Sequence, residues 1–475
     1  RRGTGINRSR RGRLRGGIQR RTRDRPRRPW RGRTHQSWWW PSQAGSLSTN
    51  AGTGPPRGLR SAAAPAVELT VPNDGSTDGP SVVSERMPDA HSVSVGVWVG
   101  IGGRDEHHRI AGASHFLEHL LFKGTDTRSS RSIAELVDAT GGEMNAFTTK
   151  EYTAFYARVP AGGQELATSL LTDVITSPAL RSEDVDSERR VILEELNLAA
   201  DDPDDVVGSL LYEEAFPSHP LGREVLGTAE SVTAMERDDI VEFHDRWYRA
   251  PNLVVAAAGD VDHAMLVDQV SEAFDGRGGA DCPVRDDELS EAGEGRSVSR
   301  QTEAVHMAWG WRGLRRDDPR RHALSLGVHV LGGGLSSRLF QTVREDRGLA
   351  YSIFAGMSGY QDTGLVTVSA GTSPEKADEL STVVAAQVGE VAAQGITAEE
   401  LEIARDGFEG SILLGLEGTG SRMARLGSSQ SLLGRVLALD DYVSLLREIT
   451  LDDVNAVLAE LLTLAATEAR VGPGS

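Results

Sequence analysis

The amino-acid sequence predicts an α+β fold: two structurally similar α/β domains in tandem, each a largely antiparallel sheet with helices packed on it. Strand-like and helix-like patterns alternate along the chain from about residue 80. Their order in residues 67–275 is repeated in residues 297–475. Residues 276–296, which contain Gly-Arg-Gly-Gly and an acidic run, are typical of a linker between the two halves.

The first half contains three clear strand patterns, with helices and further strands between the second and the third. The strands are predicted at Ser81–Glu85, Ser92–Gly100 and Leu253–Gly259. A helix carries two histidines near residue 117, and the later segments are Gly142–Val159, Gln164–Ile175 and Ser182–Leu196. Ser182 is the predicted N-cap of the last helix, because acidic residues follow it in the first turn.

The second half repeats this order. Strands are predicted around Tyr351–Met357 and Leu365–Ala370, followed by a helix near Pro374–Ala393. The next helix opens with Thr397-x-x-Glu400, which is the signature of a capping box.

The string His115-Phe-Leu-Glu118-His119 carries the clearest chemistry in the chain. Two histidines four residues apart share one helix face, with Cβ atoms about 5–6 Å apart, so both imidazoles can reach one Zn²⁺. Glu118 borders that face and can take a proton from a zinc-bound water. The string is the inverted form, H-x-x-E-H, of the commoner zinc-protease motif.

A catalytic zinc has three protein ligands, and Glu195 is the predicted third. Helical periodicity places Glu195 on the face of Val191, Ile192 and Glu188, whereas Glu194 lies on the solvated face. Glu188 is therefore predicted to assist catalysis by orienting a ligand or tuning the site.

Neutral His115 and His119 with the Glu195 carboxylate would leave the zinc site net positive, which lowers the pKa of bound water to about 7. Glu118 would then take the proton as general base and return it to the leaving amine. The second half lacks this constellation: His322 and His329 are seven residues apart with no glutamate between them, and they fit core or surface positions.

These motifs resemble those of the pitrilysin/insulinase-type zinc metallopeptidases, the inverzincins, including the mitochondrial processing peptidase β-subunit and its bacterial homologues. The resemblance covers about residues 80 to 475, and its further motifs lie in Gly141–Thr153, His219–Thr228, Trp247–Leu253 and Ser336–Tyr351.

The resemblance implies a zinc-dependent endopeptidase with one Zn²⁺ per chain. It also implies that substrate lies as an extended strand along a sheet edge near Asn145 and Ala146, and that Arg344 and Tyr351 reach the substrate backbone or the oxyanion. On the residues alone, Arg344 could be an ordinary helix-end arginine and Tyr351 a core tyrosine.

Composition limits the partners. Residues 1–60 hold 17 of the 51 basic residues and one of the 69 acidic ones, so the rest of the chain carries 34 basic and 68 acidic side chains. Such an acidic body does not favour nucleic acid. The single Cys282 excludes an intrachain disulfide and a cysteine-ligated zinc. No apolar run has the length of a membrane span, which predicts a soluble protein without a membrane partner.

The basic residues 1–66 are interpreted as a disordered or spurious extension, which predicts a bacterial cytoplasmic protein. An organellar transit peptide, which would direct the chain to the mitochondrial matrix, and a nucleic-acid-binding arm are the alternatives.

The expected partners are peptides or unfolded polypeptides and a second subunit, in a homodimer or in a heterodimer with a homologous chain. Three other functions remain open. They are the catalytic β-type subunit of an organellar presequence peptidase, a non-catalytic scaffold or regulatory homologue, and a peptide-binding module. The intact set of His115, Glu118, His119 and Glu195 argues against the last two.

Overall fold

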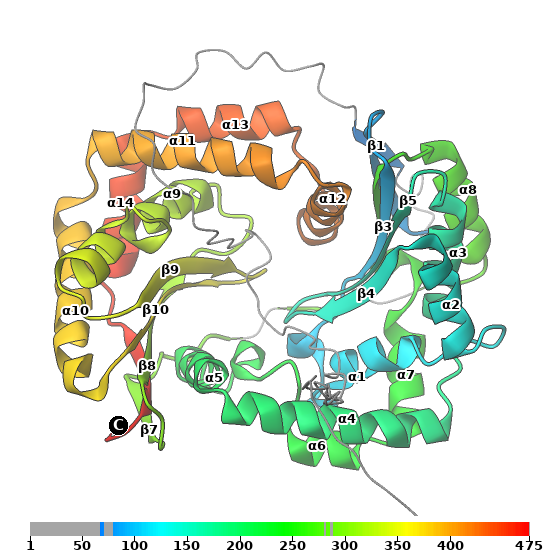
Figure 1. Ribbon diagram of the computed structural model, residues 1–475, viewed down its shortest axis with the longest axis horizontal. Coiled ribbons are helices and arrows are strands. Elements are labelled where there is room, and N and C mark those ends of the chain that lie inside the picture. Colours follow the sequence, from blue (N-terminus) through cyan, green and yellow to red (C-terminus); the bar gives the residue numbers. More distant parts are fainter. Residues whose placement is uncertain (1–66, 71–78, 280–281, 286–287, 475) are drawn as a thin grey trace, which may run out of the picture. The chain divides into compact units, whose positions relative to one another are not determined.

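The computed structural model describes residues 67–70, 79–279, 282–285 and 288–474, and its strands form two sheets (Figure 1). The first sheet has the order β1-β2-β6-β3-β5-β4 and the second the order β7-β11-β8-β10-β9. The strands of the first sheet are β1 (Val67–Thr70), β2 (Ser81–Arg86), β3 (Ser92–Val99), β4 (Glu143–Thr148), β5 (Thr153–Pro160) and β6 (Leu253–Gly259). Those of the second are β7 (Gly295–Ser299), β8 (Val305–Gly313), β9 (Ser352–Gly359), β10 (Gly364–Thr372) and β11 (Thr467–Gly472).

The two sheets repeat one topology. In each, a parallel pair (β2 with β6, β7 with β11) is extended by three antiparallel pairings, so that β4 and β9 take equivalent places at one edge. Beyond this shared set, the first sheet adds β1, antiparallel to β2. The predicted fold class, two similar antiparallel-rich α/β units in tandem, is confirmed.

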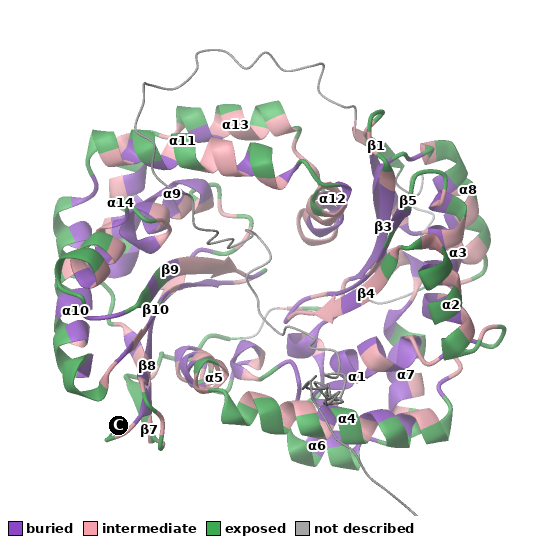
Figure 2. Cartoon of the chain, in the orientation of Figure 1, coloured by how far each residue is buried: buried purple, intermediate pink, exposed green. Residues whose placement is uncertain are grey.

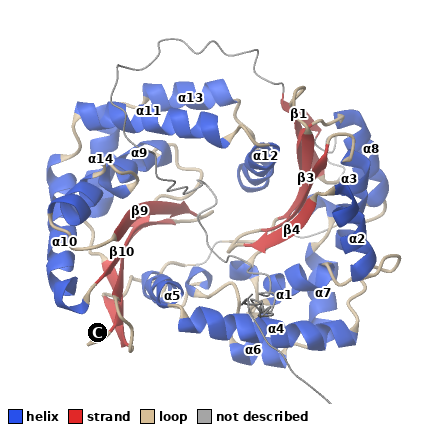
Figure 3. Cartoon of the chain, in the orientation of Figure 1, coloured by secondary structure: helices blue, strands red, loops and turns tan. Residues whose placement is uncertain are grey.

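Helices cover both sheets (Figure 3). In the first half they are α1 (Ala113–Leu121), α2 (Ser130–Thr140), α3 (Gln164–Thr176), α4 (Ser182–Asp201), α5 (Pro203–Ala215), α6 (Ala229–Ala234), α7 (Arg237–Trp247) and α8 (His263–Ala273). In the second half they are α9 (Arg321–Gly332), a π-helical turn η5 (Phe340–Asp346), α10 (Ala377–Gln394), α11 (Ala398–Gly415), α12 (Thr419–Leu433), α13 (Leu439–Glu448) and α14 (Leu451–Leu462).

Strand β3 shows why the first sheet is buried on both faces (Figure 2). Its odd-numbered valines, Val93 to Val99, join one apolar cluster with Phe116 and Leu117 of α1, whereas Trp98 belongs to a second cluster on the opposite face. Successive side chains of a strand point to opposite faces, so a sheet covered on both sides needs apolar residues at both odd and even positions.

The helix that covers the Trp98 face comes from the other half of the sequence. Met423 and Leu426 of α12 pack on Trp98, and Thr419 at the start of α12 is hydrogen-bonded to Ser94, with 2.9 Å between the hydroxyl oxygens. Arg422 of α12 also pairs with the buried Glu85 of β2.

Helix α5 of the first half makes the reciprocal contact. It packs on β8 and β11 of the second sheet (Figure 1), where Leu210 and Leu211 lie against Ala308 and Val471. Each half therefore contributes one helix to the core of the other, and residues 67–275 and 297–475 are not independent in their packing.

Two details of α4 differ from the sequence-based expectation. Arg181 is its N-cap and Ser182 its first helical residue, so the prediction of Ser182 as N-cap is wrong. Val191 is 41% exposed, so the inward face of α4 is formed by Ile192 and Glu188 without Val191.

The domain boundaries proposed from the sequence stay predictions. The extension predicted at residues 1–66 lies outside the described residues. Within the proposed linker, Arg285 donates hydrogen bonds to both carboxylate oxygens of Asp105, each at 2.7 Å, and β7 begins at Gly295. None of the described helices combines the length and the apolarity needed to cross a bilayer.

The exchange of α12 can be tested with two glycine-to-alanine substitutions in helix interiors. A Cβ at Gly427 of α12 would lie 2.2 Å from the Trp98 ring, whereas one at Gly389 of α10 meets no atom within 4 Å. Gly427→Ala should lower the free energy of unfolding by about 1–3 kcal/mol through overpacking. Gly389→Ala should raise it by about 0.5–1 kcal/mol because alanine favours helix. Urea unfolding of both variants measures this; equal stability of the two would contradict the docking of α12 on Trp98.

Candidate active site

Helix α1 presents both histidines of the H-x-x-E-H string to one site. The helix begins after Gly112, whose φ of +93° suits glycine and whose Cβ would lie 2.7 Å from the Leu226 carbonyl oxygen. The rings of His115 and His119 have centroids 4.7 Å apart, and His115 is only 4% exposed. One helical turn thus brings the two imidazoles together, as the spacing predicts.

Helix α4 packs beside α1 (Figure 1) and brings Glu195 to the histidines. Glu195 Oε2 lies 3.6 Å from His115 Nε2 and 3.5 Å from His119 Nε2. A tetrahedral zinc with bonds of about 2.0–2.2 Å separates its ligand atoms by about 3.3–3.6 Å, so both distances suit ligands of one ion. In the part of the chain that the structure describes, this is the one group of three or more His, Cys, Asp or Glu side chains placed to hold a metal ion.

Glu188, about two turns before Glu195 on α4, holds the far side of His119. His119 Nδ1 lies 3.2 Å from Glu188 Oε2, and Lys123 Nζ lies 2.6 Å from Glu188 Oε1. Donation from Nδ1–H to this carboxylate leaves the Nε2 lone pair directed at the ligand site. Although burial opposes ionisation, His119 and Lys123 hold the pKa of Glu188 below its ordinary value.

The electrostatics of the two histidines differ. Burial, reinforced by His119, lowers the pKa of His115 to about 3, so its imidazole is neutral and can act as a ligand. Burial also disfavours charge on His119, but Glu188 and Glu195 outweigh it and raise the pKa of His119 to about 9. Carboxylates that stabilise a proton there would also stabilise a divalent cation, which must displace that proton.

Glu118 is buried, with 8% of its surface exposed, and Thr148 at the end of β4 fixes its carboxylate. The Thr148 hydroxyl donates a hydrogen bond of 2.7 Å to Glu118 Oε2. Burial raises the pKa of Glu118, and the hydrogen bond from Thr148 only partly offsets this. A carboxylate with a raised pKa is suited to accept a proton and give it back.

Strand β4, which contains Asn145 and Ala146, is the edge strand next to this carboxylate. One side of β4 pairs with β5, and among the described strands none pairs with its other side. Ala146 is buried, and its backbone N–H donates to the Asn145 side-chain oxygen at 2.6 Å. The strand has the edge that strand addition requires; the roles of Asn145 and Ala146 stay predictions.

The structure brings Arg344 and Tyr351 together. The Arg344 guanidinium carbon lies 4.8 Å from the ring centroids of both Phe340 and Tyr351. Tyr351 is 82% exposed, so the alternative of a core tyrosine is wrong. An exposed tyrosine stacked on an arginine is free to meet a ligand, but contact of this pair with substrate remains a prediction.

The histidines of the second half have ordinary packing roles, as the sequence suggests. His322 lies edge-on against Tyr442, and His329 against Phe408, with ring centroids 5.4 and 5.0 Å apart.

Sequence reasoning missed the buried Glu106. Its two carboxylate oxygens accept hydrogen bonds from the backbone N–H groups of Gly112 and Ser114, at 2.6 and 2.7 Å, and so cap the start of α1. No short-range pattern marks this cap, because the acidic residue lies six positions before the usual N-cap position. The role of Thr148 was also missed.

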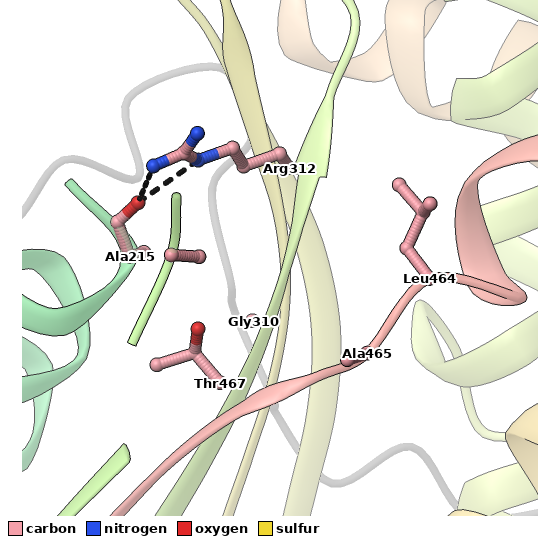
Figure 4. Close-up of a pocket in the computed structure, with 7 residues that line it drawn as sticks. Ala215, Gly310, Arg312, Leu464, Ala465 and Thr467 are labelled. Atoms are coloured by element: carbon pink, nitrogen blue, oxygen red, sulfur yellow. Dashed lines mark hydrogen bonds between the residues drawn. The ribbon is translucent and has the colours of Figure 1, made fainter. Parts of the chain in front are cut away.

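Two cavities lie away from these residues. One of about 120 Å³ lies between α5, β8 and the segment before β11 (Figure 4), where Arg312 donates two hydrogen bonds to the Ala215 carbonyl. The other, of about 710 Å³, is lined by α7 and Cys282. Neither is lined by a predicted site residue.

Two family descriptions match successive parts of the chain. The family described as Insulinase (Peptidase family M16) matches residues 81–229, and the Peptidase M16 inactive domain matches residues 234–408. A protein from Mycobacterium tuberculosis described as an uncharacterized zinc protease is 43% identical over 419 residues, covering 87% of this chain and 96% of its own. A protein of the same description from Bacillus subtilis is 35% identical over 398 residues, covering 83% and 97%.

Two solved structures share the fold. A protease from Helicobacter pylori has a TM-score of 0.79 at 21% identity, covering 86% of this chain and all of its own. A structure titled as a peptidase M16 inactive domain from Pseudomonas fluorescens has the same TM-score and identity, covering 86% and 98%. The resemblance seen in the sequence is confirmed: this chain belongs to peptidase family M16, the insulinase family.

Proposed function

We propose that this protein is a zinc-dependent endopeptidase that hydrolyses peptides or unfolded polypeptide segments. The observation that carries the proposal is the convergence of His115 and His119 from α1 with Glu195 from α4, beside the buried carboxylate of Glu118. All four residues lie in the part of the chain that matches the insulinase description. The relatives from M. tuberculosis and B. subtilis are named zinc proteases, which supports zinc as the ion.

In this proposal each residue has a defined task. His115, His119 and Glu195 hold the ion, and Glu188 fixes the orientation of His119. When bound, zinc supplies positive charge that polarises a peptide carbonyl and acidifies a water molecule. Glu118 accepts the proton of that water and returns it to the leaving amine, with Thr148 holding one oxygen of its carboxylate.

Substrate binding is proposed at the free edge of β4, where backbone hydrogen bonds would hold an extended peptide with little demand on its side chains. Arg344 and Tyr351 would contact the peptide from the second half. A bacterial cytoplasmic location and assembly with a second subunit, either an identical or a homologous chain, belong to the same proposal.

A non-catalytic role is the second candidate, because residues 234–408, most of which belong to the second half, match a domain described as inactive. That match ends before α12 and covers α9, whose histidines pack against aromatic rings. The intact carboxylate and ligand set of the first half favours the peptidase.

The role of Glu118 as base predicts a clean separation of binding from turnover. Glu118→Gln should keep one zinc per chain, since Glu118 is not a ligand, and should lower kcat for a quenched fluorescent basic peptide by about 10²–10⁴-fold. Metal analysis and initial rates on the same preparations measure both. Turnover by Glu118→Gln at the wild-type rate would show that Glu118 is not the general base.

The adjacent glutamates of α4 supply a matched pair for the metal. Glu195→Gln should lose zinc, because a neutral amide is a poor ligand, whereas Glu194→Gln, at an exposed position on the same helix, should bind zinc as wild type does. Zinc stoichiometry after dialysis is the measurement. If both variants keep zinc equally well, Glu195 is not the third ligand.

A further inference from the structure

Another buried carboxylate, Glu151, lies three residues after Thr148 in the turn that joins β4 to β5. It is 2% exposed. Glu151 Oε1 accepts hydrogen bonds from Arg104, at 2.8 Å, and from the backbone N–H of Gln361, at 3.0 Å, and its other oxygen pairs with Arg316. Arg316 and Gln361 belong to the second half of the chain, so this turn of the first half is held by the second.

The carboxylate is one member of a largely buried ionic cluster in which the charges balance. Arg104 donates two further hydrogen bonds to Asp362, at 2.9 and 2.7 Å. Arg285, from the segment between the halves, pairs with Asp105 and donates to the Glu151 carbonyl oxygen at 2.6 Å. Three arginines thus match three carboxylates, those of Asp105, Glu151 and Asp362.

The same turn is also bound to the segment that leads into α1. Gly103 and Arg104 donate backbone hydrogen bonds to the carbonyl oxygens of Thr149 and Lys150, at 3.0 and 2.9 Å. A Cβ on Gly102 would lie 2.4 Å from the Thr149 oxygen, so only glycine permits this approach. Two residues beyond Arg104, Glu106 caps α1.

The cluster therefore lies against both elements that place the general base: α1, which carries Glu118, and β4, whose Thr148 holds the Glu118 carboxylate. Burial opposes the ionisation of Glu151, but Arg316 and Arg285 outweigh it and keep the pKa of Glu151 below its ordinary value. Loss of that charge would remove the carboxylate that Arg316 pairs with and one of the two that Arg104 binds, and a largely buried arginine that loses its carboxylate forces local rearrangement.

We propose that Glu151 is a positioning residue through which the second half of the chain sets the orientation of the general base Glu118, by way of the β4–β5 turn and Thr148. The inference rests on the proposed peptidase function and adds to it a task for the second half of the chain: that half fixes the geometry of the base. Arg316 and Asp362 act in this task through Glu151 and Arg104.

The test is a double-mutant cycle on the full chain with Glu151→Gln and Thr148→Val. Each single variant should keep zinc and lower kcat by about 10- to 100-fold, the loss that small misplacements of reacting groups produce. Because both act on one carboxylate, the double variant should be no slower than the slower single variant. Glu85→Gln, which removes another buried carboxylate bridging the halves through Arg422, should lower the unfolding temperature and leave kcat unchanged.

Arg316→Gln is the second probe if Glu151→Gln does not fold, because it leaves Glu151 paired with Arg104. It should give the same loss of kcat and the same lack of additivity with Thr148→Val. Additive losses, or a lowered unfolding temperature with wild-type kcat as in Glu85→Gln, would overturn the inference.

Hydrogen exchange separates this inference from the proposed function. Glu151→Gln or Arg316→Gln should speed amide exchange in residues 143–153 and at the start of α1, and Glu85→Gln should not. If the wild-type chain hydrolyses no peptide but these differences in exchange appear, the peptidase proposal fails, whereas the structural coupling of Glu151 to the β4–β5 turn and α1 is supported. If amide exchange in residues 143–153 is unchanged in both variants, Glu151 does not position the β4–β5 turn, and the inference fails whatever the peptidase activity.

Discussion

The packing of α1 against α4 is the contact on which the candidate site depends. Neither helix can form the site alone: α1 supplies two imidazoles on one face, and α4 supplies the carboxylates of Glu188 and Glu195 seven residues apart. The buried Ile192 lies between them in sequence and anchors α4 to the apolar core that includes Phe116 and Leu117. Apolar packing between α1 and α4 thus sets the distance between the two imidazoles and the Glu195 carboxylate. The carboxylates of Glu188 and Glu195 make the site favour a positive charge.

Tandem repetition gives this protein two copies of one sheet topology with unequal chemistry. The first half holds the three side chains placed to hold a metal ion, and the corresponding helix of the second half, α9, holds histidines in aromatic contacts. The second half nevertheless contributes to the first through α12, which covers the Trp98 face, and through Arg316 and Asp362 at the β4–β5 turn. The second half therefore contributes packing and ion pairs to the half that carries the candidate site.

The sequence allowed prediction of features that depend on short-range periodicity. The H-x-x-E-H spacing placed His115 and His119 on one face, and the helical period separated Glu195 from the exposed Glu194, as the structure shows. The sheet-and-helix alternation and its repeat gave the fold class. The predicted capping box at Thr397 is also confirmed: the backbone N–H of each of Thr397 and Glu400 donates to the side chain of the other.

The features that escaped prediction depend on contacts between distant segments. Glu106 caps α1 from outside the helix, and Glu151 meets Arg316 across 165 positions of sequence. The exposure of Val191 and of Tyr351 depends on which distant segments pack against them, and sequence periodicity carries no information about those segments. Ser182 failed as an N-cap because the helix starts one residue earlier than the preference of serine suggests, with Arg181 in the extended cap position.

The most direct test of the account is hydrolysis of a quenched fluorescent basic peptide by the full chain, measured as purified, after removal of metal with a chelator, and after return of one equivalent of Zn²⁺. If the chain is a zinc-dependent peptidase, turnover disappears with the chelator and returns with one zinc per chain. Turnover that survives complete removal of metal, or a zinc-loaded chain without turnover in both its isolated and its assembled forms, would contradict it.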